Sequence, residues 1–120
     1  MKTKTYAETA ANYANVLATY DRRMKAIEER EVPRLNYVLS WGDGRFVGMA
    51  GLLDPIVTGF EKATFFGDRE AATMWLKQGL TDGANVAPHV VLAFNAKQDA
   101  IVQLQGVIDM VRGHSVEQEG

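Results

Sequence analysis

Gly42, Gly44 and Gly48 form the one stretch of the chain that resembles a nucleotide-binding turn. Such a turn uses closely spaced glycines so that backbone amides can approach a pyrophosphate at the N-terminus of a helix. A strand-like run precedes these glycines, and Glu61 follows at a distance that suits a ribose contact. However, the spacing G-x-G-x-x-x-G departs from the common G-x-G-x-x-G, and no further convincing strand follows. We therefore interpret the motif as a glycine turn, in which Gly44, Gly48 and Gly51 allow close helix contact.

Tyrosines recur every seven residues near the N-terminus and are followed by a pair of arginines. Flat rings suit base stacking or protein contact, and guanidinium groups bind phosphates or acidic surfaces. The alternative is a half-exposed seam with its hydroxyls in water, next to arginines that pair with neighbouring glutamates. We favour this second interpretation, and we keep these tyrosines and arginines as the main candidates for a binding surface. The candidate binding residues are Tyr6, Tyr13, Tyr20, Arg22, Arg23 and Trp41.

No pattern of catalytic or metal-ligating residues stands out. His89 and His114 are the only histidines, and neither has a second ligand at a suitable spacing on the same helix face. There is no cysteine, which excludes disulfides, thiolate metal sites and cysteine nucleophiles. Lys97 is more typical of a snorkelling side chain than of a buried catalytic amine. We therefore expect no enzyme activity, no catalytic residue, no cofactor and no metal.

Composition narrows the range of partners. The chain has 120 residues, 47% hydrophobic and 23% charged, which is typical of one globular domain. A net charge of −2 argues against binding to duplex nucleic acid, which needs a basic face. The most apolar stretch, Phe46 to Phe60, is too short and too interrupted to span a membrane. With no signal peptide visible and no cysteine, we expect a soluble cytoplasmic protein.

Two long helices are predicted from heptad spacing. An apolar ladder with alternating gaps of four and three predicts a helix over 5–31, which Pro33 ends. A matching ladder, broken only by Lys97, predicts a second helix over 86–112, ended by Gly113, and a frayed polar tail at 114–120. Alanine stripes beside both ladders favour close packing of the two helices. The ladders are Tyr6, Ala10, Tyr13, Leu17, Tyr20, Met24 and Ile27, and Val90, Phe94, Lys97, Ile101, Leu104, Ile108 and Val111.

The segment between the long helices is ambiguous. Residues 35–41 alternate as a strand would, whereas 46–53 has helical spacing, and a β-hairpin across Gly42–Gly44 is the rival interpretation. Asp54-Pro55 resembles the start of a helix that ends near Gly67. Asp68 is a good N-cap for a further helix, with Gly83 as its stop.

These elements predict an all-α fold, a single helical domain over 1–120 with two long helices packed lengthwise and three or four short helices between them. The alternative is α+β, with a small hairpin around 35–50. Because the ladders offer more apolar surface than one chain would use, we expect a homo-oligomer. Its predicted interface residues are Leu17, Met24, Ile27, Phe94, Ile101, Leu104 and Ile108.

The function expected from this architecture is that of a small non-enzymatic interaction protein with a protein partner. An adaptor, inhibitor or regulatory accessory factor of a virus or mobile element fits its size and its lack of catalytic signatures. The alternative is an oligomer that binds a small molecule or nucleotide in a pocket lined by Tyr13, Tyr20, Trp41 and the arginines.

Overall fold

The computed structural model describes the backbone of residues 6–51 and 54–119, and the side chains of residues 12–51 and 54–113. Over these residues the chain forms helices at both ends and a small sheet between them. The elements are α1 (Tyr6–Glu29), β1 (Tyr37–Ser40), β2 (Phe46–Met49), β3 (Pro55–Thr58), the 3-10 helix η1 (Phe60–Lys62), α2 (Arg69–Lys77), β4 (His89–Leu92) and α3 (Ala93–Glu119).

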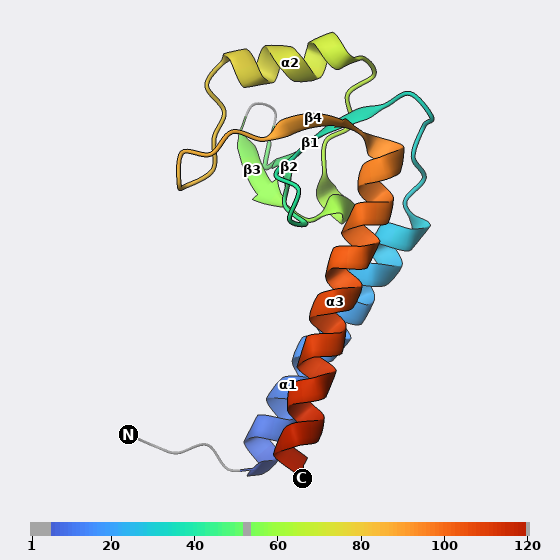
Figure 1. Ribbon diagram of the computed structural model, residues 1–120, viewed down its shortest axis with the longest axis vertical. Helices are drawn as coiled ribbons and strands as arrows, with labels where there is room; N and C mark the ends of the chain where they lie inside the picture. Colours follow the sequence, from blue (N-terminus) through green and yellow to red (C-terminus); the bar gives the residue numbers. More distant parts are fainter. Residues whose placement is uncertain (1–5, 52–53, 120) are drawn as a thin grey trace.

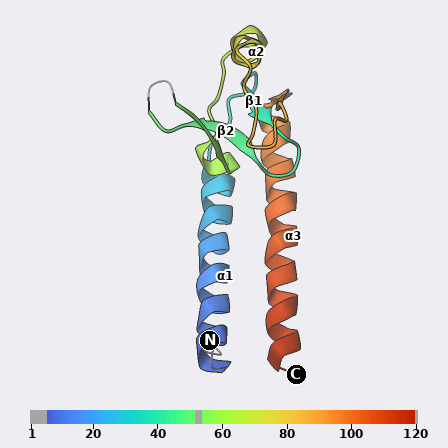
Figure 2. The same cartoon turned by 90° about the vertical axis from the view of Figure 1, so that its left-hand side faces the viewer.

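The four strands form an antiparallel sheet in the order β3-β2-β1-β4. One face of the sheet packs against the adjoining ends of α1 and α3, and α2 covers the other face (Figure 1). We call the sheet, η1, α2 and their loops the head. The two long helices run side by side out of the head (Figure 2), and we call this pair the stalk.

The stalk makes the molecule elongated. Its principal extents are 52 × 33 × 22 Å and its radius of gyration is 17.2 Å. A compact domain of this length would have a radius of gyration of about 14 Å. Much of α1 and α3 therefore lies beyond the reach of the head, and these parts contact only each other.

Two hydrophobic clusters occupy the two faces of the sheet. On the stalk side, Phe46 packs edge-on against Phe60 with ring centroids 5.4 Å apart, and both rings are fully buried. Met24, Ile27 and Leu104 complete this cluster from the long helices. On the α2 side the cluster consists of Leu39, Val47, Phe66 and Ala72, with Trp75 and Leu76 at its margin.

Two cations hold the C-terminal end of α1 in place. The Lys97 ammonium of α3 donates to the backbone oxygens of Glu28 (2.8 Å) and Arg30 (2.9 Å), carbonyls left unpaired where α1 ends. The Arg30 guanidinium donates to the carbonyls of Phe60 and Ala63 at 2.6 Å each, and so joins the end of α1 to the head. Lys97 therefore links α3 to the end of α1.

The all-α prediction is wrong, and so is the description of the chain as a helical bundle. The rival hairpin across Gly42–Gly44 is what forms, and it belongs to a larger sheet. The predicted helix over 46–53 is in fact β2, where Phe46, Val47 and Gly48 are all buried. Because helices cover both faces of the sheet, β2 lacks the apolar–polar alternation that identifies a strand in a sequence, whereas β1 lies within the segment 35–41 that does alternate.

Other boundaries also need correction. The helix predicted from Pro55 to Gly67 is replaced by β3 and η1, and Pro55 begins an edge strand, a position where proline is tolerated. The last helix begins at Ala93 instead of 86, because 89–92 pairs with β1, and its backbone continues past Gly113.

One helix was predicted well, and the start of a second was predicted well. The helix expected over 5–31 is α1, and from residue 12 onward its ladder residues face the seam. Asp68 caps α2 as predicted, because its carboxylate accepts from the backbone N–H of Ala71 at 2.7 Å, but α2 ends at Lys77 and not at the predicted stop, Gly83. None of the helices described is both long and apolar enough to cross a bilayer.

Candidate functional site

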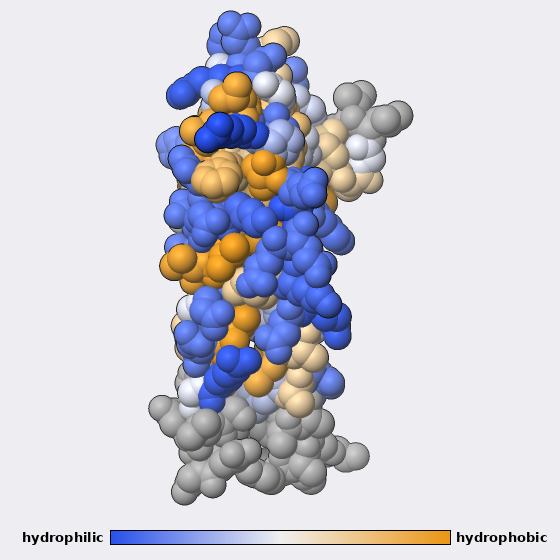
Figure 3. Space-filling model, turned by 90° about the vertical axis from the view of Figure 1, so that its right-hand side faces the viewer, coloured by the Kyte–Doolittle hydropathy of each residue, from blue (hydrophilic) through white to orange (hydrophobic). Residues whose placement is uncertain are grey.

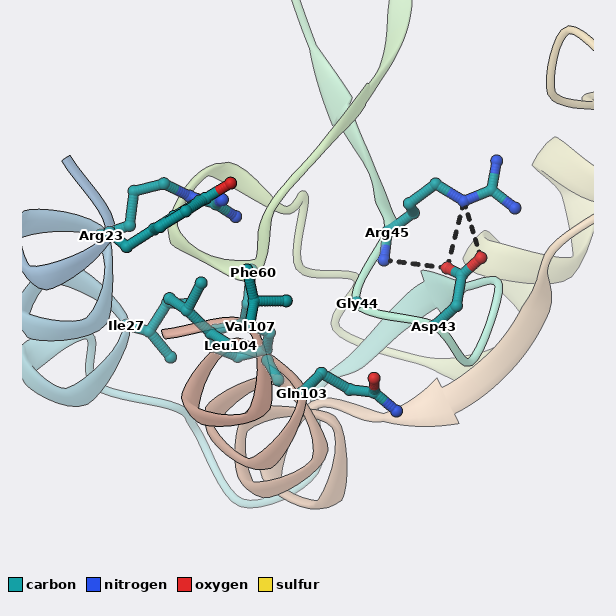
Figure 4. Close-up of a pocket in the computed structure, with 11 residues that line it drawn as sticks. Arg23, Ile27, Asp43, Gly44, Arg45, Phe60, Gln103, Leu104 and Val107 are labelled. Carbon is teal, nitrogen blue, oxygen red and sulfur yellow. Dashed lines mark hydrogen bonds and ion pairs between the residues drawn. The ribbon is translucent and has the colours of Figure 1, made fainter. Parts of the chain in front are cut away.

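A groove lies where the stalk enters the head. Its volume is about 250 Å³. Arg23 and Arg45 flank it from opposite sides, and Ile27, Leu104 and Val107 lie between them (Figure 4). The remaining lining residues are Tyr20, Asp43, Gly44, Phe60, Ala100 and Gln103.

Arg23 is paired with a carboxylate of the head. Its Nε donates to Oε1 of Glu61 at 2.8 Å, and the Glu61 side chain is largely buried. The other carboxylate oxygen, Oε2, is buried and has no hydrogen-bond partner among the described residues. Gly59 makes room for this pair, because a Cβ there would collide with Glu61 and lie 2.5 Å from the Arg23 guanidinium. Arg23 therefore joins α1 to η1.

Arg45 is held by two carboxylates. Its guanidinium donates to Asp43 at 2.9 Å and to Asp82 at 2.8 Å, and it lies over the Trp41 ring at 5.2 Å from the centroid. The hydrogen bond from Arg45 to Asp82 raises the pKa of Arg45, with a further contribution from Asp43. Both flanking guanidiniums of the groove are thus matched by acidic groups.

Asp82 organises the loop between α2 and β4. Its Oδ1 accepts from the backbone N–H groups of Ala84 and Val86 at 2.9 Å each. The hydrogen bond from Val86, followed by that from Arg45, lowers the pKa of Asp82 below its usual value. The indole Nε1 of Trp41 donates to the Val86 carbonyl at 2.8 Å, so this loop is tied to β1 as well.

The structure brings together only part of the predicted binding set. Tyr20 and Arg23 both line the groove. Tyr13 is half-buried further along the seam, and Arg22 is exposed on another side of α1, where it bonds Thr19. Trp41 does not line the groove, but its ring contacts Arg45, which does. The side chain of Tyr6, like that of His114 and the predicted tail at 114–120, lies outside the described side chains.

The predicted interface residues are placed unevenly. Met24, Ile27, Leu104 and Ile108 are buried within one chain, so they present no surface to a second copy. Leu17 and Ile101 are half-buried at the margin of the same cluster. Phe94 is the exposed member, at 56%. The surface available to a partner is therefore displaced from the ladder itself to its flanks.

One flank of the stalk exposes a set of uncharged side chains, with Arg23 of α1 beside them in the groove. Tyr20, Gln103 and Val107 line the groove together, and Val16 and Thr19 lie beside Tyr20 in a second shallow hollow. Met110 follows Val107 at helical spacing on the same side of α3. We call this set the uncharged face; its residues are Val16, Thr19, Tyr20, Gln103, Val107 and Met110.

The opposite flank of the stalk is polar. There Asp21 of α1 and Arg112 of α3 approach to 3.8 Å across the two helices, and both side chains are more than half exposed. Figure 3, which views the molecule from the opposite side to Figure 2, shows hydrophilic side chains over much of the stalk, with apolar groups between them.

The glycine motif has a purely structural role. Gly42 and Gly44 have positive φ angles of 80° and 93°, which only glycine adopts readily, and they form the turn between β1 and β2. Gly44 lies near Gln103 of α3, and a Cβ at Gly48 would lie 2.6 Å from the Lys62 carbonyl oxygen. The strand that follows this turn, β2, pairs antiparallel with β1, as a glycine turn in a hairpin requires. Gly51, by contrast, has no close neighbour.

Sequence reasoning missed Arg45 and Gln103 as groove residues, and it considered Glu61 only for a ribose contact and not as the partner of Arg23. Their positions depend on contacts between segments far apart in the chain, such as the pairing of Arg45 with Asp82. The signal that was available is the Asp82-Gly83-Ala84-Asn85 turn, whose aspartate typically bonds backbone groups two residues on.

Comparisons with known proteins assign neither a family nor a function to this chain. No protein-family model matches the chain, and neither curated proteins nor solved structures gave a significant match. Within the described part of the chain, no three His, Asp or Glu side chains gather closely enough to hold a metal ion.

Proposed function

We propose that this protein is a small non-enzymatic interaction protein that binds another protein through the uncharged face of its stalk and acts as an oligomer. The observation that carries this proposal is the projection of a two-helix stalk beyond its head, with exposed apolar side chains on one flank. The exposed fractions of Val16 (40%), Val107 (36%) and Met110 (62%) show that this flank presents apolar surface.

Burial of this surface would stabilise a complex. A pair of helices can cover only the seam between them, so the side chains on its flanks remain in water unless another element packs there. Each Å² of apolar surface removed from water contributes roughly 25 cal/mol. Tyr20 also fits such a role, because tyrosine provides both an apolar ring and a polar hydroxyl at protein interfaces.

The test compares two substitutions of the same type on one helix. Val107→Asp places a charge on the uncharged face, whereas Val102→Asp places it about 140° around α3. Affinity capture followed by native mass spectrometry should show bound protein that Val107→Asp removes and Val102→Asp retains. Equal capture by both variants would mean that the uncharged face is not the contact surface. We expect the cytoplasm as the compartment, because the chain has no cysteine.

A small-molecule site at the groove is the second candidate, because Tyr20 and Arg23 do meet there. The geometry supports it less well. Both guanidiniums already bind carboxylates, and the volume of about 250 Å³ is below the range of roughly 300–1,000 Å³ typical of ligand pockets. A thermal shift with a nucleotide panel that Arg23→Ala abolishes would favour this candidate over the first.

A further inference from the structure

We propose that the outer edge of β3 pairs antiparallel with the same edge of a second copy of this chain, so that the two four-stranded sheets join into one. The pairing is made by backbone groups of residues 55–59 and leaves the uncharged face free. This inference rests on the oligomer of the proposed function and names the interface of that oligomer.

The hydrogen bonds between β2 and β3 fix which backbone groups of β3 face outward. Pro55, which has no N–H, pairs with Met49, and next to this pair the Ala50 N–H donates to the Asp54 carbonyl at 2.8 Å. Because bonded and non-bonded pairs alternate along an antiparallel ladder, the even-numbered residues of β3 bond to β2. The odd-numbered residues therefore direct their backbone groups away from the sheet.

The outward groups lie at the edge of the sheet and have no partner among the described residues. They are the N–H and C=O of Val57, the C=O of Pro55 and the N–H of Gly59. The Gly59 C=O is different, because it already accepts from the Lys62 N–H at 3.2 Å. Unpaired backbone groups at a sheet edge are a template for another strand.

The edge of β3 is also uncharged and accessible. Charged side chains usually protect such edges, but residues 55–59 include none, and Ile56 (37%) and Val57 (48%) are exposed. The opposite edge of the sheet, β4, is less accessible, because Pro88 is buried and Val90 is half-buried. The strand β3, at the margin of the head (Figure 1), is therefore the edge open to another strand.

The pattern of the outward groups favours a second copy over an unrelated strand. In an antiparallel pairing centred on Val57, the two Val57 residues donate to each other, and each Gly59 N–H donates to the Pro55 C=O of the other copy. Because Pro55 has no N–H, an ordinary residue opposite it would leave its own carbonyl unpaired. Gly59 avoids this cost, since its carbonyl is already bonded to Lys62.

The side chains are compatible with this register. Thr58 pairs with Phe46 of the stalk-side cluster, so Thr58 and Ile56 lie on the stalk side of the sheet. Val57 pairs with Val47 and lies on the α2 side. The dimer therefore places Ile56 beside Thr58 of the second copy, and the two Val57 side chains meet at the two-fold axis. Because the interface is small, we expect a reversible dimer.

Sedimentation equilibrium of the whole chain, from micromolar to submillimolar concentration, measures the association. We expect a monomer–dimer equilibrium that Val57→Lys weakens by roughly tenfold or more, because two like charges would meet at the axis. Val102→Lys should leave the equilibrium unchanged, since Val102 is exposed (69%) on α3, away from this edge. Circular dichroism checks that both variants fold.

Amide hydrogen exchange tests the register in the native chain, so its result does not depend on the folding of a variant. The Val57 and Gly59 amides should exchange more slowly as the concentration rises, because they gain acceptors in the dimer. The Ile56 amide is the internal control. It should be protected at every concentration, because it bonds to Gly48 within one copy.

Three results would overturn the proposal: a monomer at every concentration, equal effects of the two lysine substitutions, or Val57 and Gly59 amides whose exchange does not change with concentration. If the dimer is absent but the chain captures a partner that Val107→Asp loses, the edge pairing is wrong and the partner surface of the proposed function stands. If Val57→Lys abolishes a dimer and no partner is captured, the edge pairing stands and the partner surface is wrong. If both the dimer and the capture are absent, the proposed function fails as well.

Discussion

At the residue scale, close packing and buried polar pairs decide which side chains the head tolerates. Gly48 lies where β2 meets η1, with the Lys62 carbonyl and the Thr58 methyl group both within 3 Å of where a Cβ would stand. Asp82 is buried, and its hydrogen bonds to two backbone amides and Arg45 organise a loop of otherwise exposed residues. These two positions give separate tests of the structure.

Gly48→Ala should destabilise the protein by about 1–3 kcal/mol, because the backbone of η1 must move away from the new methyl group. Gly67→Ala is the matched control, since nothing lies within 4 Å of its added Cβ. We expect that control to change stability by less than about 1 kcal/mol. Urea denaturation of the three proteins measures the difference, and equal midpoints would contradict the close approach of β2 and η1.

Asp82 should contribute to the loss of stability in acid. Because its pKa is lowered in the folded state, its contribution is complete above the ordinary carboxyl pKa of about 3.9 and is lost as the pH falls through the lowered value. Asp82→Asn should therefore be less stable at neutral pH and should show a shallower decline into acid. Denaturant titrations at several pH values test this, with Asp99→Asn on the exposed side of α3 as the control. A slope identical to that of the native chain would contradict the role of Asp82.

At the scale of elements, the C-terminus of α1 is stabilised by groups from elsewhere in the chain. Lys97 of α3 binds its terminal carbonyls, and Arg30 extends from it to η1, with the guanidinium 3.9 Å from the Phe65 ring centroid. Burial lowers the pKa of the Arg30 guanidinium, and the nearby Glu61 carboxylate acts in the opposite direction. These contacts set how the stalk is aligned with the head.

Lys97→Met should lower the free energy of unfolding by about 1–2 kcal/mol, because two carbonyls at a helix end lose a charged donor while the aliphatic part is kept. Lys25→Met is the comparison, since Lys25 pairs with Glu29 at 3.9 Å on an exposed surface. Its effect should stay within about 0.5 kcal/mol. Thermal unfolding followed by circular dichroism distinguishes the two variants. If Lys97→Met leaves the free energy of unfolding unchanged, the end of α1 does not need this donor.

At the scale of the whole molecule, the stalk separates this fold from a compact domain. One hydrophobic cluster lies between the sheet and α2, and the other lies between the sheet and the adjoining parts of α1 and α3. Further along the stalk, apolar side chains are exposed on one flank of the seam between α1 and α3. The strongest candidate for a contact surface therefore lies on the stalk, outside the hydrophobic core.

Small-angle scattering at low concentration should give an elongated particle. We expect a radius of gyration near the 17.2 Å of the Cα atoms, with a small increase for side chains and hydration. A value near 14 Å, as for a compact domain, would mean that the stalk folds back on the head. The radius should rise with concentration if the chain forms the proposed oligomer.

The sequence by itself determined the helices and the turns. The ladder from Tyr13 to Ile27, the Asp68 cap and the glycine turn at Gly42–Gly44 all depend on residues within a few positions of one another, so their patterns are readable locally. The sequence alone also shows that the chain has no cysteine and therefore no cysteine-based site. Sequence also placed Tyr20 and Arg23 in one candidate set, because they are neighbours on a helix.

Only the tertiary structure decided the sheet, the groove and the uncharged face. The short segments 46–49 and 89–92 become strands because they pair with residues distant in sequence, and cover on both faces removes the alternation that would reveal them. Arg45 reaches Asp82, and Glu61 reaches Arg23, only after that sheet has formed. Heptad spacing predicted that the long helices would pair, but which flank stays exposed depends on where the head packs. That is a property of the whole chain, and local spacing cannot encode it.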